Sequence, residues 1–267
     1  HITLSQSALT SPVYSIRGLQ SKSNSQVMVL IDGEHINATT GGSTIFGFRK
    51  SLTAYKQIEV IRGPGSAIYG ADSFSGVINL VTKKADTQEN SNESSSSVGF
   101  RVGSFDSLHG WFEHQGRLAT LDYRLTVDLY SSDDDSERIV NSDLQTLLDG
   151  IFATSASQAP GSIDNSYNIQ DITLNVKGDG WSGSLWHYRN NRAGLGPGAA
   201  QALDPSGHFT NGISLGKLSF DLSSWLEGSA SIGFSAQREF IHTLYHIFPA
   251  GAVLPIGSDG NLDFVAP

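Results

Sequence analysis

The chain has 267 residues and a formal net charge of -9 at pH 7. An acidic chain lacks the basic face that neutralises phosphates, so we expect no nucleic-acid partner. The sequence contains no cysteine, which excludes disulfides and thiolate metal sites. It also has no run of about 18 apolar residues, which excludes a membrane-spanning helix but not spanning strands, because these carry apolar residues only at alternate positions.

Residues 1–85 have the pattern of a small α+β domain. Three short apolar runs predict strands at 27–31, 58–61 and 77–81, and the unbroken run 27–31 is expected to be fully buried. Between the last two runs, Pro64 can occupy the first position of a short helix that continues through Tyr69. Gly70 is a suitable residue to end this helix.

The remainder of the chain has a different pattern. The segment 86–97 is polar throughout and ends in four serines, so we interpret it as a linker. From residue 98 to 267 apolar and polar residues tend to alternate, which is the side-chain period of a strand. In the clearest case, 121–129, the ionisable residues share one face of the strand. We predict about seven strands of roughly 9 to 11 residues, the length that a tilted strand needs to cross a bilayer.

The connections between these strands favour a barrel. Short connections near 116–117, 178–180 and 223–224 alternate with long polar ones at 131–165 and 193–211. Short turns on one side and long loops on the other are typical of outer-membrane barrels. A soluble antiparallel sheet with one wet face remains an alternative, because alternation by itself does not distinguish lipid from a protein core.

Three motifs in the N-terminal domain point to one family. Residues 61–83, with the sequence IRGPGSAIYGADSFSGVINLVTK, closely resemble the signature that closes the plug domain of TonB-dependent outer-membrane receptors. SIRGL at 15–19 and VLIDG at 29–33 resemble two further plug motifs, in the order and at the spacing usual for the family. The resemblance implies an α+β plug domain at 1–85 followed by antiparallel transmembrane β-barrel strands.

The resemblance also implies that the chain is a piece of a longer protein. In the family a TonB box precedes the plug, and no such segment is found before residue 15. About seven strands form only an incomplete barrel, since plugged transporters have about 22. We therefore expect truncation at both ends, with the barrel part at 98–267.

The expected function follows from the family. Its members reside in the outer membrane of Gram-negative bacteria, bind a scarce ligand such as siderophore-iron, haem or cobalamin, and import it with proton-motive force. The expected partners are TonB with its inner-membrane energising complex, the small-molecule or metal-chelate ligand, and outer-membrane lipid. No cofactor is expected.

Other functional classes find less support in the sequence. An enzyme is not expected, because no catalytic triad order, paired-carboxylate motif or metal-ligand spacing occurs. A passive porin or a structural or adhesive β-sheet protein is the alternative, but a porin lacks a folded α/β segment before its strands.

The resemblance assigns roles to individual plug residues. The plug signature comprises Gly63, Pro64, Gly65, Tyr69, Gly70 and Gly76. In the family, arginines placed like Arg17 and Arg62 pair with carboxylates of the barrel wall and lock the plug. A buried guanidinium without a partner is costly, so we expect a matching acid in the barrel.

Ligand contacts and metal sites are harder to predict. By resemblance, the loop after VLIDG rises to the extracellular apex of the plug, which makes four residues candidate substrate contacts: Glu34, His35, Asn37 and Thr39. We predict no metal site. His242 and His246 have the spacing of a metal-binding pair on a helix, but they lie near the end of a strand, where this spacing does not indicate such a site. Whether the acidic stretch 131–150 binds cations is left open, since such stretches usually stay solvated.

Overall fold

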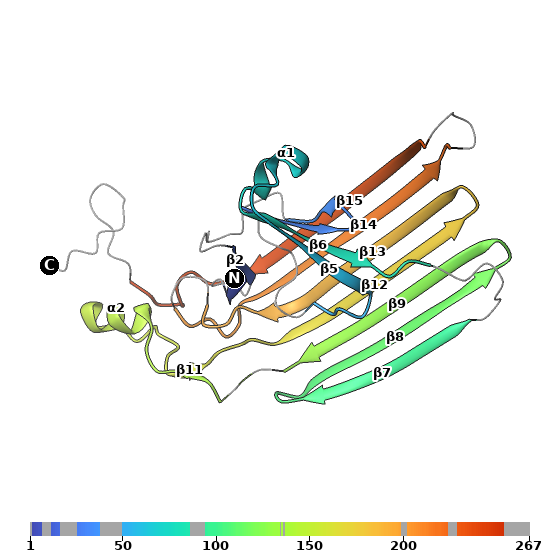
Figure 1. Cartoon of the computed structure of the whole chain (residues 1–267). Helices are drawn as coiled ribbons and strands as arrows, with labels where there is room; N and C mark the ends of the chain where they lie inside the picture. The colour runs from blue at the N-terminus through green and yellow to red at the C-terminus, as the bar shows by residue number, and fades with distance from the viewer. Residues whose placement is uncertain are drawn as a thin grey trace.

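The computed structural model describes residues 2–6, 12–16, 26–37, 50–85, 94–133, 135, 137–198, 202–223 and 229–253. The described residues form two parts, an N-terminal unit and a large antiparallel sheet, and the N-terminal unit lies against one face of that sheet (Figure 1).

The N-terminal unit contains two small sheets. One is the antiparallel pair β1 (Ile2–Gln6) and β2 (Pro12–Ile16). The other has the strand order β4-β3-β6-β5, and its strands are β3 (Val27–Ile31), β4 (Glu34–His35), β5 (Tyr55–Arg62) and β6 (Gly76–Thr82). Strands β3 and β6 are parallel, whereas β5 runs antiparallel to β6. All three predicted strands of this unit are therefore confirmed.

Strand β3 is buried on both faces, which explains its unbroken apolar sequence. Val29 and Ile31 belong to a core cluster shared with residues of the large sheet. Met28 and Leu30 belong to a second cluster, against which Tyr69 packs. Tyr69 ends the short helix α1 (Ser66–Tyr69), and a 3-10 turn, η1 (Ala71–Ser73), follows it.

The predicted helix is present but begins later than expected. Its N-cap is Gly65, so Pro64 lies before the helix and not at its first position. The helix ends at Gly70, whose φ of 92° is readily available only to glycine.

The large sheet has seven strands, close to the predicted number, and forms a single antiparallel meander. Its strand order is β15-β14-β13-β12-β9-β8-β7, and every neighbouring pair is antiparallel. The strands are β7 (Ser95–Gly103), β8 (Ser107–Leu118), β9 (Leu121–Ser132), β12 (Tyr167–Gly178), β13 (Trp181–Gly194), β14 (His208–Asp221) and β15 (Ser231–Leu244). Strand β7 starts three residues before the expected boundary, because Ser95, Ser96 and Ser97 pair with β8 despite their polarity.

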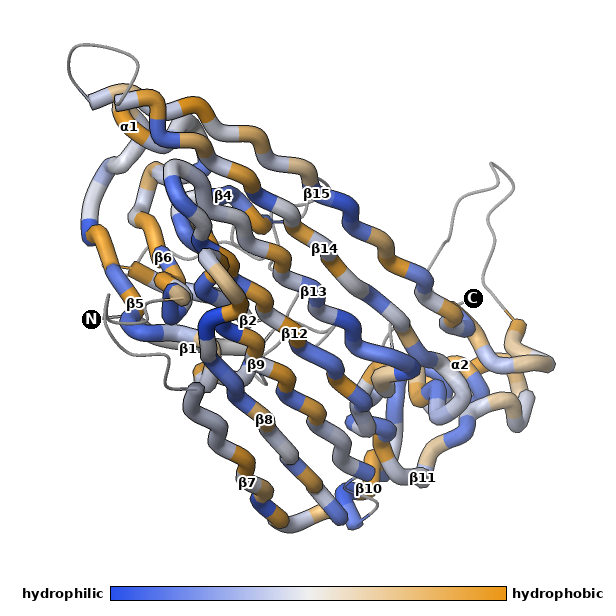
Figure 2. Tube along the Cα trace, turned by 90° about the vertical axis from the view of Figure 1, so that its right-hand side faces the viewer, coloured by the Kyte–Doolittle hydropathy of each residue, from blue (hydrophilic) through white to orange (hydrophobic). Residues whose placement is uncertain are grey.

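The two ends of the large sheet differ. Two-residue turns, 119–120 and 179–180, close the hairpins β8–β9 and β12–β13 at one end. The opposite end carries the long connections 133–166 and 195–207, and the first of these contains an unpredicted helix, α2 (Leu144–Phe152), between β10 (Ile139–Val140) and β11 (Gly161–Ser162). Figure 2 shows α2, β10 and β11 together at this end, away from α1.

A soluble sheet that covers a core buries its apolar face and exposes its polar face. The large sheet has the opposite arrangement. Thr126, Asp128, Asp171, Thr173 and Asn175 are buried on the face that the N-terminal unit covers. The opposite face exposes large apolar side chains, among them Phe112, Leu129, Leu185, Leu218 and Phe234. This alternation is visible along each strand as successive polar and apolar segments (Figure 2). The face that is open in this chain is therefore the apolar one.

Candidate functional site

The contact between the N-terminal unit and the large sheet gathers most of the buried charged groups. Lys50 is at its centre. Its ammonium group forms an ion pair with Asp171 on β12, and the side chains are only 6% and 4% exposed. The same ammonium lies 4.7 Å from the ring centre of Trp186 on β13. Burial lowers the pKa of Lys50, and the neighbouring carboxylates of Asp171 and Asp128 act in the opposite direction.

The next residue, Ser51, makes a second contact with the large sheet. Its hydroxyl donates a hydrogen bond of 2.7 Å to the carboxylate of Asp128 on β9. The imidazole of His109 on β8 lies 2.9 Å from the same carboxylate oxygen and stacks on the ring of Tyr130 at 3.7 Å. Asp128 is thus held by both parts of the chain.

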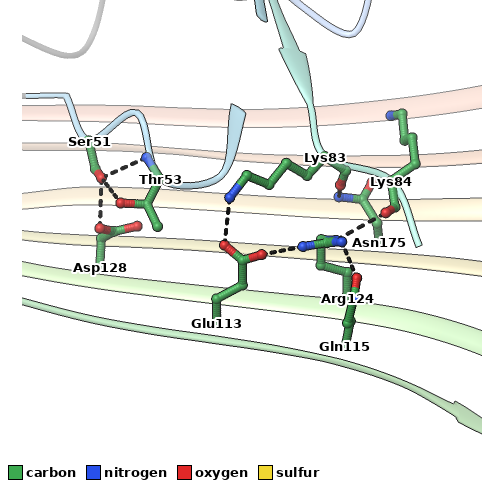
Figure 3. Close-up of polar contacts among 9 residues, drawn as sticks. All are labelled: Ser51, Thr53, Lys83, Lys84, Glu113, Gln115, Arg124, Asp128 and Asn175. Carbon is green, nitrogen blue, oxygen red and sulfur yellow. Dashed lines mark hydrogen bonds and ion pairs between the residues drawn. The ribbon is translucent and has the colours of Figure 1, made fainter. Parts of the chain in front are cut away.

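A third contact joins the end of the N-terminal unit to β8 and β9 (Figure 3). Lys83 and Glu113 form an ion pair of 2.7 Å. Glu113 also pairs with Arg124, whose Nε donates a hydrogen bond of 3.0 Å to the carbonyl oxygen of Lys84. In Figure 3 the nitrogen of the Lys83 side chain lies above the carboxylate of Glu113, and dashed lines join this carboxylate to both Lys83 and Arg124.

The turn that follows β3 is hydrogen-bonded both to β6 of its own unit and to β14 of the large sheet. The carboxylate of Asp32 accepts hydrogen bonds from the backbone nitrogen and the hydroxyl of Thr82, at 3.0 and 2.6 Å. Lys217 on β14 donates to the carbonyl oxygen of Asp32 at 3.0 Å and forms an ion pair of 2.9 Å with Glu34. This turn therefore bridges to the part of β14 that is close to its end at Asp221.

A cavity of about 630 Å³ lies beside this turn, between the N-terminal unit and strands β12 to β14. Both parts of the chain contribute its charged lining residues, which are Asp32, Glu59, Lys84, Lys177 and Lys217. The two parts are thus in contact at discrete places and separated by open space elsewhere.

The four predicted ligand contacts do not share one environment in the structure. Glu34 and His35 form β4 directly after the Asp32 turn, and Glu34 pairs with Lys217 in the half of β14 that ends at 221, away from the long connections. This position differs from the expected one at the apex. Asn37 is buried, and its amide group bonds to the backbone of Val29 and Val27, so it braces β3. His35 is exposed, and Thr39 lies outside the described residues.

Of the two predicted lock residues, the structure describes only Arg62. Arg17 lies outside the described residues. Arg62, the last residue of β5, is exposed, and no ion pair joins it to a residue that the structure describes. A carboxylate partner for Arg62 therefore stays a prediction.

The glycines of the signature allow close packing. Gly63 has a φ of 128°, and Gly76 lies so close to β5 that a Cβ atom would be 2.5 Å from the carbonyl oxygen of Ile61. Gly76→Ala should therefore destabilise the N-terminal unit by about 1–3 kcal/mol, the usual cost of overpacking. Amide hydrogen exchange of β3 and β6 in the complete protein measures this effect. Gly216→Ala is the control, because its Cβ would meet nothing within 4 Å, and equal protection in both variants would contradict the prediction.

Two aspartates organise the long connections. Asp143 caps α2 by accepting a hydrogen bond from the backbone nitrogen of Thr146, and it accepts another from that of Leu203 in the next connection. Asp149 accepts hydrogen bonds from the hydroxyl of Thr154 and the backbone nitrogen of Ser157. These two carboxylates of the acidic stretch therefore accept hydrogen bonds from groups within the long connections.

A pH dependence follows from these bonds. The Thr154 hydroxyl first, and then the Ser157 and Gln145 groups, lower the pKa of Asp149 to about 2. A depressed pKa stabilises the folded loop at pH values above the unfolded value near 3.8, and this stabilisation is lost as pH falls toward 2. We expect exchange of amides 143–157, corrected for intrinsic rates, to rise over this interval. In Asp149→Asn the rise should shrink, and an unchanged profile would contradict the assignment.

Sequence patterns did not reveal the contacts made by Lys50 and Ser51. Asp128 and its neighbours were recognisable as the polar face of a strand, but nothing in the local sequence around Lys50 marks it as a buried cation. The partner Asp171 is 121 positions away, so only the assembled structure connects them.

The geometry defines a class of protein, one in which a small α+β domain docks on the polar face of a sheet whose other face is apolar. Residues 2–77 match the family model of the TonB-dependent Receptor Plug Domain, so the N-terminal unit is a plug domain of this family and is called the plug below. The vitamin B12 transporter BtuB of Vibrio vulnificus is 40% identical over 76 residues, which are 28% of this chain and 12% of that protein. An iron-regulated outer membrane virulence protein of Vibrio cholerae is 37% identical over 90 residues, 32% of this chain and 13% of that protein.

Solved structures resemble more of the chain than these relatives do. The ferric yersiniabactin uptake receptor FyuA of Yersinia pestis matches 94% of this chain and 38% of its own, with a TM-score of 0.62 and 20% identity. The siderophore receptor PirA of Acinetobacter baumannii matches 98% of this chain and 38% of its own, with a TM-score of 0.56 and 20% identity. The large sheet thus has the fold of part of such a barrel, and the chain spans about two-fifths of the length of these receptors. In the described residues, no helix is long and apolar enough to cross a membrane.

Proposed function

We propose that the complete protein is an outer-membrane receptor that binds a scarce ligand and imports it with energy transduced through TonB. The observation that carries this proposal is the reversed polarity of the large sheet. Asp128, Asp171 and Thr173 are buried under the plug, whereas Leu185 and Phe234 are exposed on the other face. A barrel wall in lipid has this arrangement, with polar residues toward the lumen and apolar ones toward the acyl chains.

The contact between plug and sheet supports a transport role over a purely structural one. Much of it consists of ion pairs and hydrogen bonds, made by Lys50, Ser51, Lys83 and Lys217. Such polar groups can be hydrated when the plug moves, and the cavity beside the Asp32 turn leaves room for movement.

The proposed ligand class is a siderophore-iron complex, haem, cobalamin or a similar chelate. Two relatives are named for vitamin B12 transport and for iron regulation, and this likeness supports the class without selecting a member. The proposed partners are TonB with its inner-membrane complex and the lipid of the outer membrane. His35, which is exposed, and Thr39 stay proposed ligand contacts.

Uptake by the complete protein tests the proposal. It would be expressed in an outer-membrane host without its own receptors, and uptake of radiolabelled cyanocobalamin, haem and radioiron-loaded siderophores would be measured. We expect uptake of one of these ligands to cease in a strain without TonB and on addition of a protonophore. Uptake that persists at the same rate without TonB would identify a passive porin and contradict the proposal.

Arg62 is proposed to pair with a carboxylate of the barrel in the complete protein. Arg62→Ala should then increase hydrogen exchange in β5 and β6 of the plug while ligand binding is retained. Lys56→Ala, another exposed position on β5, is the matched control. Equal exchange in the two variants would argue against a lock at Arg62.

A further inference from the structure

Among the described lysines and arginines that form ion pairs in the contact, Lys50 has the least exposed side chain, at 6%. Besides its ion pair with Asp171, its ammonium lies over three aromatic rings. The distances to the ring centres are 5.0 Å for Tyr55, 4.7 Å for Trp186 and 5.6 Å for Tyr188. A cation over aromatic faces is stabilised by the ring quadrupoles, and this attraction is stronger when water is excluded.

The large sheet presents a site that is built around this cation. Asp171 and Asp128 are directly opposite each other on the adjacent strands β12 and β9. The indole nitrogen of Trp186 donates a hydrogen bond of 2.8 Å to one oxygen of Asp171. The ammonium of Lys50 donates to the other oxygen of the same carboxylate. Two buried carboxylates side by side repel each other, so a cation between the plug and this pair is needed to balance them.

Other ion pairs between plug residues and their partners are more exposed. The lysine side chain is 35% exposed in Lys83–Glu113, 55% in Lys84–Asp32 and 32% in Lys217–Glu34, compared with 6% for Lys50. Exposed pairs contribute little because water and salt screen them. Among these ion pairs, that of Lys50 is therefore the best shielded from water, and it lies beside the hydrogen bond from Ser51 to Asp128 and the apolar cluster that the plug shares with the sheet.

We propose that Lys50 is the positioning residue that holds the plug in its resting place, and that transport requires its withdrawal from the site formed by Asp128, Asp171 and Trp186. This inference rests on the proposed transport function. Withdrawal leaves the paired carboxylates of the sheet without their cation, so the plug is drawn back to the same position when the energising force ends. Ser51 ties the same segment of the plug to the adjacent strand.

Cross-linking in the complete protein tests the withdrawal step. Ser51→Cys and Asp128→Cys would be joined by a short bifunctional thiol reagent with a reducible link. The 267 residues contribute no other cysteine, and any cysteine in the remainder of the protein would first be replaced. The control is Arg117→Cys with Asp122→Cys, a pair within the sheet that is joined by an ion pair of 2.6 Å. The probes are radiolabelled cyanocobalamin and a radioiron-loaded siderophore.

We expect the Ser51–Asp128 cross-link to abolish uptake while surface binding persists, and reduction to restore it. The Arg117–Asp122 cross-link should leave uptake unchanged. If the parent protein imports a probe and the cross-linked Ser51–Asp128 variant imports it equally, the inference is wrong and the proposed function stands. If the parent imports it without TonB, the proposed function fails.

A second measurement needs no ligand. In Lys50→Gln the amides of residues 51–55 should exchange on the order of a hundredfold faster or more, since one partner of a buried ion pair is lost. Lys50→Arg should restore most of the protection, and Lys84→Gln should change it little. Unchanged exchange in Lys50→Gln would overturn the positioning role even in a protein that imports none of the probes.

Discussion

Asp171→Leu should weaken the docking of the plug by about 3–5 kcal/mol in the complete protein, because it leaves the ammonium of Lys50 buried without a carboxylate. Lys50→Met should have an effect of similar size, since it leaves Asp171 and Asp128 as adjacent buried carboxylates. Denaturant-dependent hydrogen exchange of plug amides in the folded complete protein gives the free energy of plug release for each variant.

The double variant Lys50→Met with Asp171→Leu measures the interaction between these two residues, apart from what each contributes through its other neighbours. Replacing both members of a buried ion pair by apolar residues of similar size is often neutral, so the double variant should recover most of the stability lost by either single change. Lys84→Met serves as the matched control, because the Lys84 side chain is 55% exposed and pairs with Asp32 within the plug, so its loss should change plug docking by less than about 1 kcal/mol. Additive losses in the double variant would show that Lys50 and Asp171 act independently.

The second large effect concerns the 267-residue chain expressed without the remainder of the protein. We expect it neither to insert stably into the outer membrane nor to import ligand. In the described structure, the outer edges of β7 and β15 are unpaired. Each unpaired backbone group in the hydrocarbon layer costs several kcal/mol, and these edges are 9 and 14 residues long.

The same chain should aggregate in water. Its apolar face includes Phe112, Leu129, Leu185, Leu218 and Phe234, which form a surface that soluble proteins avoid. Expression of this chain and of the complete gene in parallel, followed by heat-modifiability on gels and by uptake assays, compares the two forms. A stable membrane species that imports ligand from the 267-residue chain would show that it is a self-sufficient unit.

Local sequence was sufficient for most of the secondary structure. The unbroken apolar run of β3 and the alternation along β9 record which faces of each strand are buried, because side chains alternate between the two faces of a strand. The turn at 179–180 and the short helix that ends at Gly70 could be found in the same way. The turn predicted at 116–117 was wrong, because these residues continue β8 and the chain reverses at 119–120. The family resemblance then supplied the identity of the plug, from three motifs within the first 83 residues.

Local sequence was less informative where structure depends on pairing. Ser95, Ser96 and Ser97 have the composition of a linker, but β8 offers them backbone partners and they extend β7. Helix α2 lies in a polar stretch that was interpreted as an irregular loop. Its capping box, Asp143 with Thr146, is a local feature, whereas the bond from Leu203 to Asp143 forms only where the two connections are adjacent.

The sequence by itself determined the approximate positions of β3, β5, β6 and most long strands, the polar face of the clearest strands, and the family to which the plug is related, since these properties depend on neighbours a few positions apart. The tertiary structure decided where the charges meet. Lys50 and Asp171 are separated by 121 positions, and Asp171 faces Asp128 only through the register of β12 and β9. Burial makes such a pair energetically important, and burial is a property of the assembled fold that no short segment carries.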